Sequence, residues 1–257
     1  MQNIILTVAY DGTHYLGWQK NQEGKSIEEA LEKTLSQILQ EKIILQAASR
    51  TDAGVHANEQ IVNFFSSHHI EPKKLQMSLN ALLPKDITII NVHPALTHFH
   101  PTLDCIAKEY HYYICNHHYQ LPFHRNYSWH YFYPLELPLM QRSASLLIGK
   151  HDFATFCNTK KNEVYTHTVR NLTSIEIIPL PQNRICFKIV GENFLYKMVR
   201  NIIGTLVYIG NGKIPINKLS RILESCDRTQ AGITAPAHGL FLHKVYYPGG
   251  IFNDTTQ

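Results

Sequence analysis

Runs of apolar residues recur along the chain with periods of about two and about 3.6 residues, which predict strands and helices respectively. In the first hundred residues, the apolar run 4–10 predicts a strand. Ser26-Ile27-Glu28-Glu29 has the form of a capping box and predicts the start of a helix. We expect this helix to pack on a sheet, because its apolar residues recur at helical spacing, at Ile27, Ala30, Leu31, Leu35, Ile38 and Leu39.

The same patterns predict further elements as far as residue 92. Residues 43–48 and 60–65 indicate two strands. A helix is predicted from Pro72 to Leu83, where Pro84 stops it, and the next strand runs over 87–92. The first part of the chain therefore has the order β-α-β-β-α-β, which is that of a split βαβ unit.

A second cycle of elements begins near Asp104. Its first strand is expected to place Tyr110, Tyr112 and Ile114 on one face, and His111, Tyr113 and Cys115 on the other. Helices are predicted over 139–148, ending at Gly149, around the apolar residues from Phe194 to Leu206, and over 218–225 with Asn217 as N-cap. Strands are predicted over 172–178, 185–190 and 239–246.

These elements predict an α+β fold made of two similar α/β halves with mainly antiparallel sheets. We expect a domain at residues 1–103, a second at 104–257, and an active-site cleft between them. A chain of 257 residues is long enough for each half to bury a core.

Composition and charge favour a soluble globular protein with a basic second half. Hydrophobic residues make up 44% of the chain and charged residues 17%. Residues 1–100 carry 8 Lys and Arg against 10 Asp and Glu, a balance of −2, whereas residues 101–257 carry 16 against 10, a balance of +6. Such a surplus is an electrostatic footprint for a polyanion, although many globular domains are as basic without binding nucleic acid.

Cysteine usage and hydropathy indicate the cytoplasm. The five cysteines are odd in number and form no Cys-x-x-Cys pair, which is typical of reduced thiols. The first apolar run lacks a preceding basic region, so it is interpreted as a strand and not as a signal peptide. The longest strongly apolar run without charge, 201–212, is shorter than the roughly 20 residues that span a bilayer, so no membrane association is expected.

One loop places a carboxylate in the setting of a nucleophile. Asp52 lies between Arg50 and Gly54 in the segment 48–57, which separates two predicted strands. Gly54 allows backbone angles that other residues avoid, and the arginine favours the ionised form of the carboxyl group. Taken alone, the segment is more typical of a hairpin whose aspartate caps its own turn than of a nucleophile.

Six segments together resemble the tRNA pseudouridine synthase A family, in their order and in their approximate separations. The resemblance covers nearly the whole chain. The segments are 10–19, 50–56, 107–112, 149–156, 197–204 and 227–240.

The resemblance implies an isomerase that converts uridine to pseudouridine at positions 38, 39 and 40 in the anticodon stem-loop of tRNA. It also implies a homodimer. Substrate and product are isomers, so no cofactor is expected. By the resemblance Asp52 is the nucleophile; whether it attacks C6 of the base or C1′ of the sugar is left open.

Four residues are expected to bind the substrate, three of them by the resemblance. Tyr110 matches the aromatic residue that stacks on the flipped base, and Arg200 matches an arginine that holds the nucleophile ionised and oriented. Arg50 is the candidate for entering the space that the base vacates or for binding its phosphate. Leu242 matches an apolar position that lines the pocket. The chain departs from the family at Thr102, where an arginine is usual, and this places one contact in doubt.

Two alternative functions remain from the residues themselves. An aspartate-dependent glycosidase or nuclease needs a second carboxylate or a metal, and only Glu59 lies close to Asp52 in sequence. A non-catalytic RNA-binding module with two α/β halves would survive loss of Asp52. The chain has sixteen histidines, but no metal site is expected. His117, His118, His124 and His130 lack a companion cysteine or acid at ligand spacing, and His56 has no partner Cys-x-x-Cys.

Overall fold

The computed structural model describes residues 1–159 and 167–249, and the chain divides into two compact units. The first unit comprises residues 1–107 together with the segment from Phe241 onward, and the second comprises residues 108–240. Both are mixed α/β units, as expected. The boundary lies close to the predicted one, but the last strand belongs to the first unit. The sequence placed the whole segment 104–257 in one domain, whereas the final strand groups with the first unit because it pairs with a strand from the first part of the chain.

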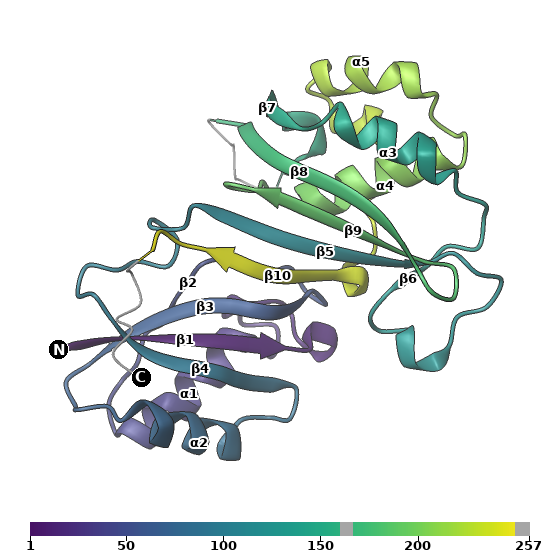
Figure 1. The fold of residues 1–257 in the computed structure, drawn as a ribbon. Coiled ribbons are helices and arrows are strands. Elements are labelled where there is room, and N and C mark those ends of the chain that lie inside the picture. Colours follow the sequence, from purple (N-terminus) through teal and green to yellow (C-terminus); the bar gives the residue numbers. More distant parts are fainter. Residues whose placement is uncertain (160–166, 250–257) are drawn as a thin grey trace. The chain divides into compact units, whose positions relative to one another are not determined.

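The first unit is built on a sheet whose strands follow the order β4-β1-β3-β10 (Figure 1). β1 (Gln2–Tyr10) pairs antiparallel with both β3 (His56–Ser66) and β4 (Ile87–Ala95). β2 (Gln46–Ala47) pairs antiparallel with β3, whereas β10 (Leu240–Tyr246) pairs with β3 in parallel. The sheet is thus mainly antiparallel, as predicted.

Two helices cover one face of this sheet (Figure 1). α1 (Ile27–Leu39) begins as the capping box predicts, because Ser26 Oγ accepts a hydrogen bond from the Glu29 N–H at 3.2 Å. α2 (Pro72–Leu82) has its proline in the first turn, where a missing N–H costs nothing. Both helices bury leucines at helical spacing, namely Leu31, Leu35, Leu75 and Leu79.

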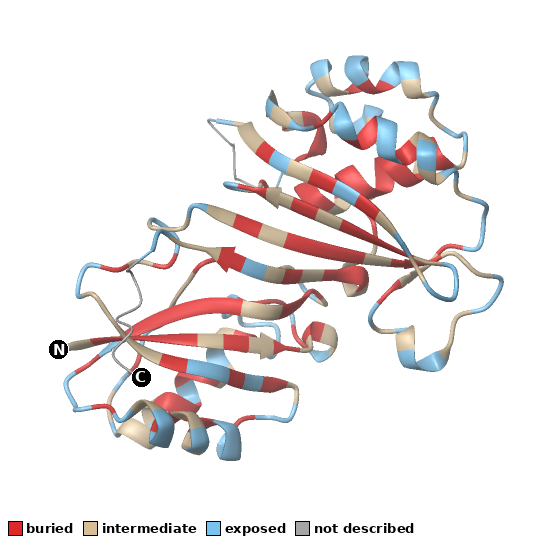
Figure 2. Cartoon of the chain, viewed as in Figure 1, coloured by how far each residue is buried: buried red, intermediate tan, exposed pale blue. Residues whose placement is uncertain are grey.

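The strands of the second unit pair antiparallel in the order β5-β9-β8-β7. The strands are β5 (Ala107–Cys115), β7 (Gly149–Asp152), β8 (Val169–Leu180) and β9 (Arg184–Gly191), and the short β6 (Trp129–His130) pairs in parallel with β5. The helices are α3 (Leu137–Ser145), α4 (Met198–Gly210) and α5 (Leu219–Glu224). α3 packs on α4 and β8, and Figure 2 shows α4 as a largely buried helix.

Several element boundaries differ from the prediction. β2 has two residues instead of the six predicted over 43–48. α4 starts at Met198, so Phe194 and Leu195 precede it, because Lys197 has a left-handed backbone (φ 59°) that interrupts the helical path. The N-cap of α5 is Lys218 and not Asn217, since a 3-10 turn over Ile216–Lys218 leads directly into the helix.

None of the described helices is both long enough and apolar enough to cross a membrane.

Candidate active site

Asp52 lies in the loop that joins β2 to β3, as the sequence predicted. The Val55 N–H donates a hydrogen bond to the Asp52 carbonyl oxygen at 3.1 Å, which closes a tight turn. Gly54 has φ 76° within this turn, a conformation that favours glycine. The Asp52 side chain is half-buried, so a carboxylate is presented at the tip of a defined loop.

Two glycines of segment 10–19 allow this loop to be approached closely. A Cβ atom on Gly12 would overlap the carbonyl oxygen of Val55. One on Gly17 would lie 2.6 Å from the Thr51 carbonyl oxygen, and Gly17 also has φ 95°. Only glycine fits at either position, so the first segment of the family pattern is a backbone support for the Asp52 loop.

Hydrogen bonds fix the two segments together. The Trp18 N–H donates to the Thr51 carbonyl at 3.0 Å, and the Gly54 N–H donates to the Tyr15 carbonyl at 3.3 Å. The Tyr10 hydroxyl forms a buried hydrogen bond with Thr51 Oγ1 at 2.7 Å. Asp52 is therefore flanked on both sides by residues whose backbone is held in place, which preorganises its carboxylate.

His56 adds a buried anchor at the end of the loop. Its Nδ1 accepts a hydrogen bond from the Gly12 N–H at 3.0 Å and lies 3.1 Å from Asp11 Oδ1. Its ring stacks on Phe241 of β10 at 4.6 Å between centroids. The sequence offered His56 only as part of a motif, and its role in joining three segments depends on contacts that are distant along the chain.

The side chain of Arg50, in the same loop as Asp52, is exposed to solvent. The preceding backbone is clamped, because Gln60 Nε2 donates to the Ser49 carbonyl at 2.6 Å and the Ser49 N–H donates to Gln60 Oε1 at 3.2 Å. Among the described residues, the Arg50 guanidinium forms no hydrogen bond or ion pair. An exposed guanidinium whose neighbouring backbone is held in place is suited to contact a phosphate.

Thr102 contacts the strand that enters the loop. Its hydroxyl donates to the Ala47 carbonyl at 2.7 Å. The Thr102 N–H donates to His100 Nδ1 at 3.1 Å. The residue that departs from the family pattern thus supports β2.

Leu242 is fully buried on β10, where it lies opposite Ala57 of β3. His243 follows it and faces the other side of the strand. His243 Nδ1 lies 3.0 Å from Asn58 Nδ2.

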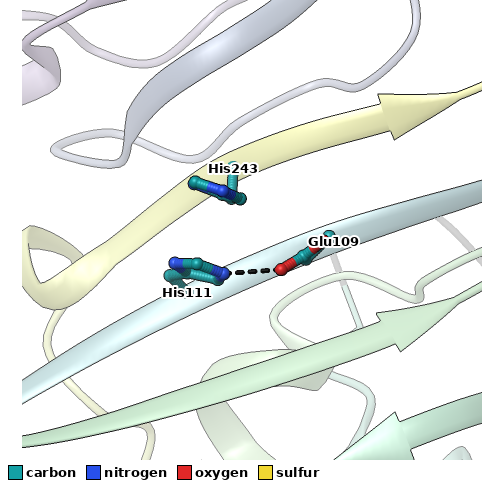
Figure 3. A group of neighbouring side chains, drawn as sticks. All are labelled: Glu109, His111 and His243. Carbon is teal, nitrogen blue, oxygen red and sulfur yellow. Dashed lines mark hydrogen bonds and ion pairs between the residues drawn. The ribbon is translucent and has the colours of Figure 1, made fainter.

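Tyr110 lies on β5 in the second unit, opposite Ile189 of β9. Its side chain is 7% exposed, and its ring meets Phe194 edge-on at 5.0 Å between centroids. The neighbours Glu109 and His111 form their own pair, in which His111 Nε2 donates to Glu109 Oε1 at 2.6 Å (Figure 3). The alternation predicted for this strand places Tyr110 away from that polar pair.

Arg200 lies in the first turn of α4, and its position is set by a loop from further along the chain. Its Nε donates to the Ala235 carbonyl at 2.7 Å, and the Ala235 N–H donates to the Arg200 carbonyl at 3.1 Å. The left-handed Lys197 immediately before the helix is a strained position of the kind found at functional sites.

A polar cluster of Asn158, Asn201, Arg228 and Thr234 fixes this loop against α4. Asn201 is fully buried, and its Oδ1 accepts from Arg228 Nη2 at 2.9 Å and from Thr234 Oγ1 at 2.7 Å. Its Nδ2 donates to Asn158 Oδ1 at 2.8 Å. Arg228 Nη1 donates to the Gly232 carbonyl at 2.9 Å. The buried amide has its hydrogen-bonding atoms satisfied, so it stabilises the site.

Two further glycines bring the loop and the helix into backbone contact. A Cβ on Gly204 would overlap the carbonyl oxygen of Ile233, and one on Gly232 would lie 2.7 Å from the Gly204 carbonyl oxygen. The Gly232 N–H donates to Thr205 Oγ1 at 2.8 Å. Segments 197–204 and 227–240 therefore form one assembly that carries Arg200.

Tyr112 supports the end of this assembly. Its hydroxyl donates to the Pro236 carbonyl at 2.9 Å, and its ring leaves no room for a Cβ on Gly239. Burial raises the pKa of Tyr112 well above its ordinary value, and the positive charge of Arg200 opposes part of that rise. The sequence predicted the strand face of Tyr112 but not this contact.

Comparison with known proteins identifies the family. A family model described as tRNA pseudouridine synthase matches residues 6–103 and 143–248. The chain is 54% identical over 248 residues to tRNA pseudouridine synthase A 2 of Protochlamydia amoebophila, covering 96% of this chain and 95% of the relative. It is 42% identical to tRNA pseudouridine synthase A of Thermoanaerobacter sp., covering 96% and 100%, and 38% identical to that of Chlamydia felis, covering 96% and 92%. The chain therefore belongs to the tRNA pseudouridine synthase family of isomerases.

Proposed function

We propose that this enzyme converts uridine to pseudouridine at positions 38, 39 and 40 of the tRNA anticodon stem-loop, with Asp52 as the nucleophile. In this reaction the bond between N1 of uracil and C1′ of ribose breaks, and a bond from C5 to C1′ forms. The C5 proton is lost, and N1 gains a proton. The observation that supports Asp52 is its half-buried carboxylate on a turn that two segments hold in place.

The other predicted residues take roles that fit their surroundings. Tyr110 stacks on the extruded uracil, since its ring is already oriented by Phe194. Arg200 favours the ionised form of the Asp52 carboxyl group, and its bond to Ala235 orients the guanidinium. Arg50 contacts the phosphate of the extruded nucleotide, and Leu242 supplies an apolar wall for the base.

Release of tritium from tRNA labelled at uridine C5 tests the reaction directly. Wild-type protein should release tritium into water, and Asp52→Asn, which keeps the shape of the side chain but removes the charge, should release none above background. Glu59→Gln, on the same hairpin, is the matched control and should retain full release. Absence of release from the wild type would refute the isomerase, and undiminished release from Asp52→Asn would refute the nucleophile.

The same experiment separates the two alternative functions. A glycosidase or nuclease would liberate uracil or cut the chain, which chromatography of the product detects, and it would lose activity in Glu59→Gln. A binding module would retain tRNA in Asp52→Asn and show no release in any variant.

The positions in tRNA need a separate measurement. Pseudouridine should disappear from positions 38–40 in tRNA from a strain that lacks this protein and return when the gene is restored. Pseudouridine that persists at all three positions would contradict the assignment to the anticodon stem-loop.

We also propose that the enzyme is a cytoplasmic homodimer. The five cysteines are all free, as expected for a protein in a reducing compartment that contains tRNA. Sedimentation at working concentration should give twice the mass of the chain, and a monomer would refute the dimer.

A further inference from the structure

The segment of residues 116–133, here called the aromatic loop, has a composition unlike the rest of the chain. It contains seven aromatic residues and four histidines but no Asp or Glu. It follows β5, includes β6 and leads toward α3 (Figure 1). The family model matches residues 6–103 and 143–248, so this loop lies outside the matched regions.

Polar side chains of the aromatic loop are used to tie its own backbone together. Asn116 Nδ2 donates to the carbonyl oxygens of Tyr131 and Tyr133, at 2.6 and 2.7 Å. Gln120 Nε2 donates to the Ser128 carbonyl at 2.8 Å. The Ser128 side chain is buried, and its hydroxyl donates to the His124 carbonyl at 3.0 Å. The loop is therefore held in one conformation by internal hydrogen bonds.

Four of its seven aromatic side chains, in contrast, are more than half exposed to solvent. Phe123 is 80% exposed, Tyr119 62%, Phe132 54% and Tyr133 52%. Phe123 belongs to a short 3-10 turn over Pro122–His124. A loop with polar groups inside and large rings outside reverses the usual preference of folded chains, and such exposed apolar groups mark interaction sites.

The charges beside these rings favour an anionic partner. Arg125 is an exposed cation on the loop. The Lys213 ammonium lies over the Tyr133 ring at 5.9 Å and over the Tyr208 ring at 4.6 Å, in cation–π geometry. Exposed rings interleaved with cations and free of carboxylates are the surface on which unpaired nucleic-acid bases stack while their phosphates meet positive charge.

We propose that the aromatic loop is a tRNA-binding surface in its own right, on which unpaired bases other than the target uridine stack against Phe123 and its exposed neighbours. The inference rests on tRNA as substrate and requires no assignment of the chemical step. It predicts that the aromatic loop contributes to the affinity for tRNA and not to the turnover rate of the enzyme once tRNA is bound.

Substitution of Phe123 tests stacking, because the side chain is too exposed to matter for folding. Phe123→Ala should weaken tRNA binding about 10-fold, within the range measured for loss of one stacked base. KM in tritium release should rise by the same factor with kcat unchanged. Phe123→Trp should bind as tightly as the wild type, whereas Phe123→Leu should behave like the alanine variant. Met77→Ala, which alters an exposed apolar side chain on α2, is the control and should bind normally.

A photoreactive benzoylphenylalanine at position 123 identifies the occupant. Cross-linking to tRNA supports the proposal, and cross-linking to a second copy of the chain in the presence of tRNA overturns it, as does unchanged binding by Phe123→Ala. The binding of tRNA with and without Phe123→Ala is also measured in the Asp52→Asn background. tRNA binding there still depends on Phe123 even if Asp52 is not the nucleophile, so failure of one proposal is distinguishable from failure of the other.

Discussion

Arg200 and Ala235 exchange two hydrogen bonds, one from the arginine Nε to the Ala235 carbonyl at 2.7 Å and one from the Ala235 N–H to the Arg200 carbonyl at 3.1 Å. The first bond fixes the plane of the guanidinium, and the second fixes the helix turn that carries it. The direction of the Arg200 side chain therefore depends on residues 228–235 as much as on α4.

Arg228 should act as a positioning residue for Arg200. Arg228→Met removes the hydrogen bonds to Asn201 and Gly232, and each bond to a charged group contributes about 1.5–3 kcal/mol. We expect kcat for tritium release to fall at least 10-fold with little change in tRNA binding. Arg221→Ala, which removes an exposed arginine from α5, should leave kcat unchanged.

A second substitution separates positioning from general stability. Arg200→Lys lacks the Nε atom that bonds to Ala235, so in that background Arg228→Met should lower kcat much less. An equal loss of kcat in both backgrounds would show that Arg228 acts through stability alone. Full activity of Arg200→Lys would instead remove Arg200 from the proposed site.

Gly204→Ala should disrupt the contact between α4 and the loop that follows α5. A Cβ at this position overlaps the Ile233 carbonyl oxygen, and backbone shifts of this kind cost about 1–3 kcal/mol. The free energy of unfolding, measured with guanidinium chloride, should fall by that amount, and kcat should fall with it because Arg200 is displaced. Gly249→Ala, where an added Cβ meets nothing within 4 Å, is the control. Wild-type stability in Gly204→Ala would contradict the close approach.

Thr102 should support the Asp52 loop through Ala47. Thr102→Val keeps the shape of the side chain but removes the donor to the Ala47 carbonyl, and a single bond of this type contributes about 0.5–1.5 kcal/mol. We expect a loss of stability in that range, measured by denaturant unfolding, and a modest fall in kcat. Thr102→Ser retains the hydroxyl and should restore both. A Thr102→Ser variant as weak as Thr102→Val would argue against the hydrogen bond.

Local signals in the sequence account for most of the elements. The capping box at Ser26 and the proline at position 72 determine where α1 and α2 begin, because helix ends depend on neighbouring residues. The alternation along residues 110–115 predicts the two faces of β5, because successive side chains of a strand point to opposite sides of the sheet. Gly54 was expected to allow backbone angles that other residues avoid, and it has φ 76°.

Long-range contacts account for what the sequence did not predict. β10 joins β3 of the first unit, although it lies almost two hundred residues later, and no local period encodes that pairing. Arg228 resembles any arginine in a polar turn until the fold places Asn201 beside it. The roles of Asp52, Tyr110, Arg200 and Leu242 came from family resemblance, and that of Arg50 from its place in the Asp52 loop. All of these roles stay predictions until the variants are measured.

Tyr112 should make the free energy of unfolding fall as the pH rises above 10. Burial raises its pKa well above the ordinary value near 10, so the unfolded chain releases this proton at lower pH than the folded chain does. The contribution of this proton to the free energy of unfolding is fully present below pH 10. It is lost as the pH rises from 10 toward the pKa of Tyr112 in the folded protein. One such proton changes the free energy of unfolding by about 1.4 kcal/mol per pH unit.

Tyr112→Phe removes this titrating group, so the slope of stability against pH above 10 should become shallower by about that amount. The variant also loses the hydrogen bond to the Pro236 carbonyl, which lowers stability at every pH by about 1 kcal/mol. Urea unfolding at intervals above pH 9 measures both effects, and Tyr119→Phe, at an exposed site, is the control. An unchanged slope in Tyr112→Phe would show that the hydroxyl ionises normally and that the Pro236 turn does not bury it as the fold requires.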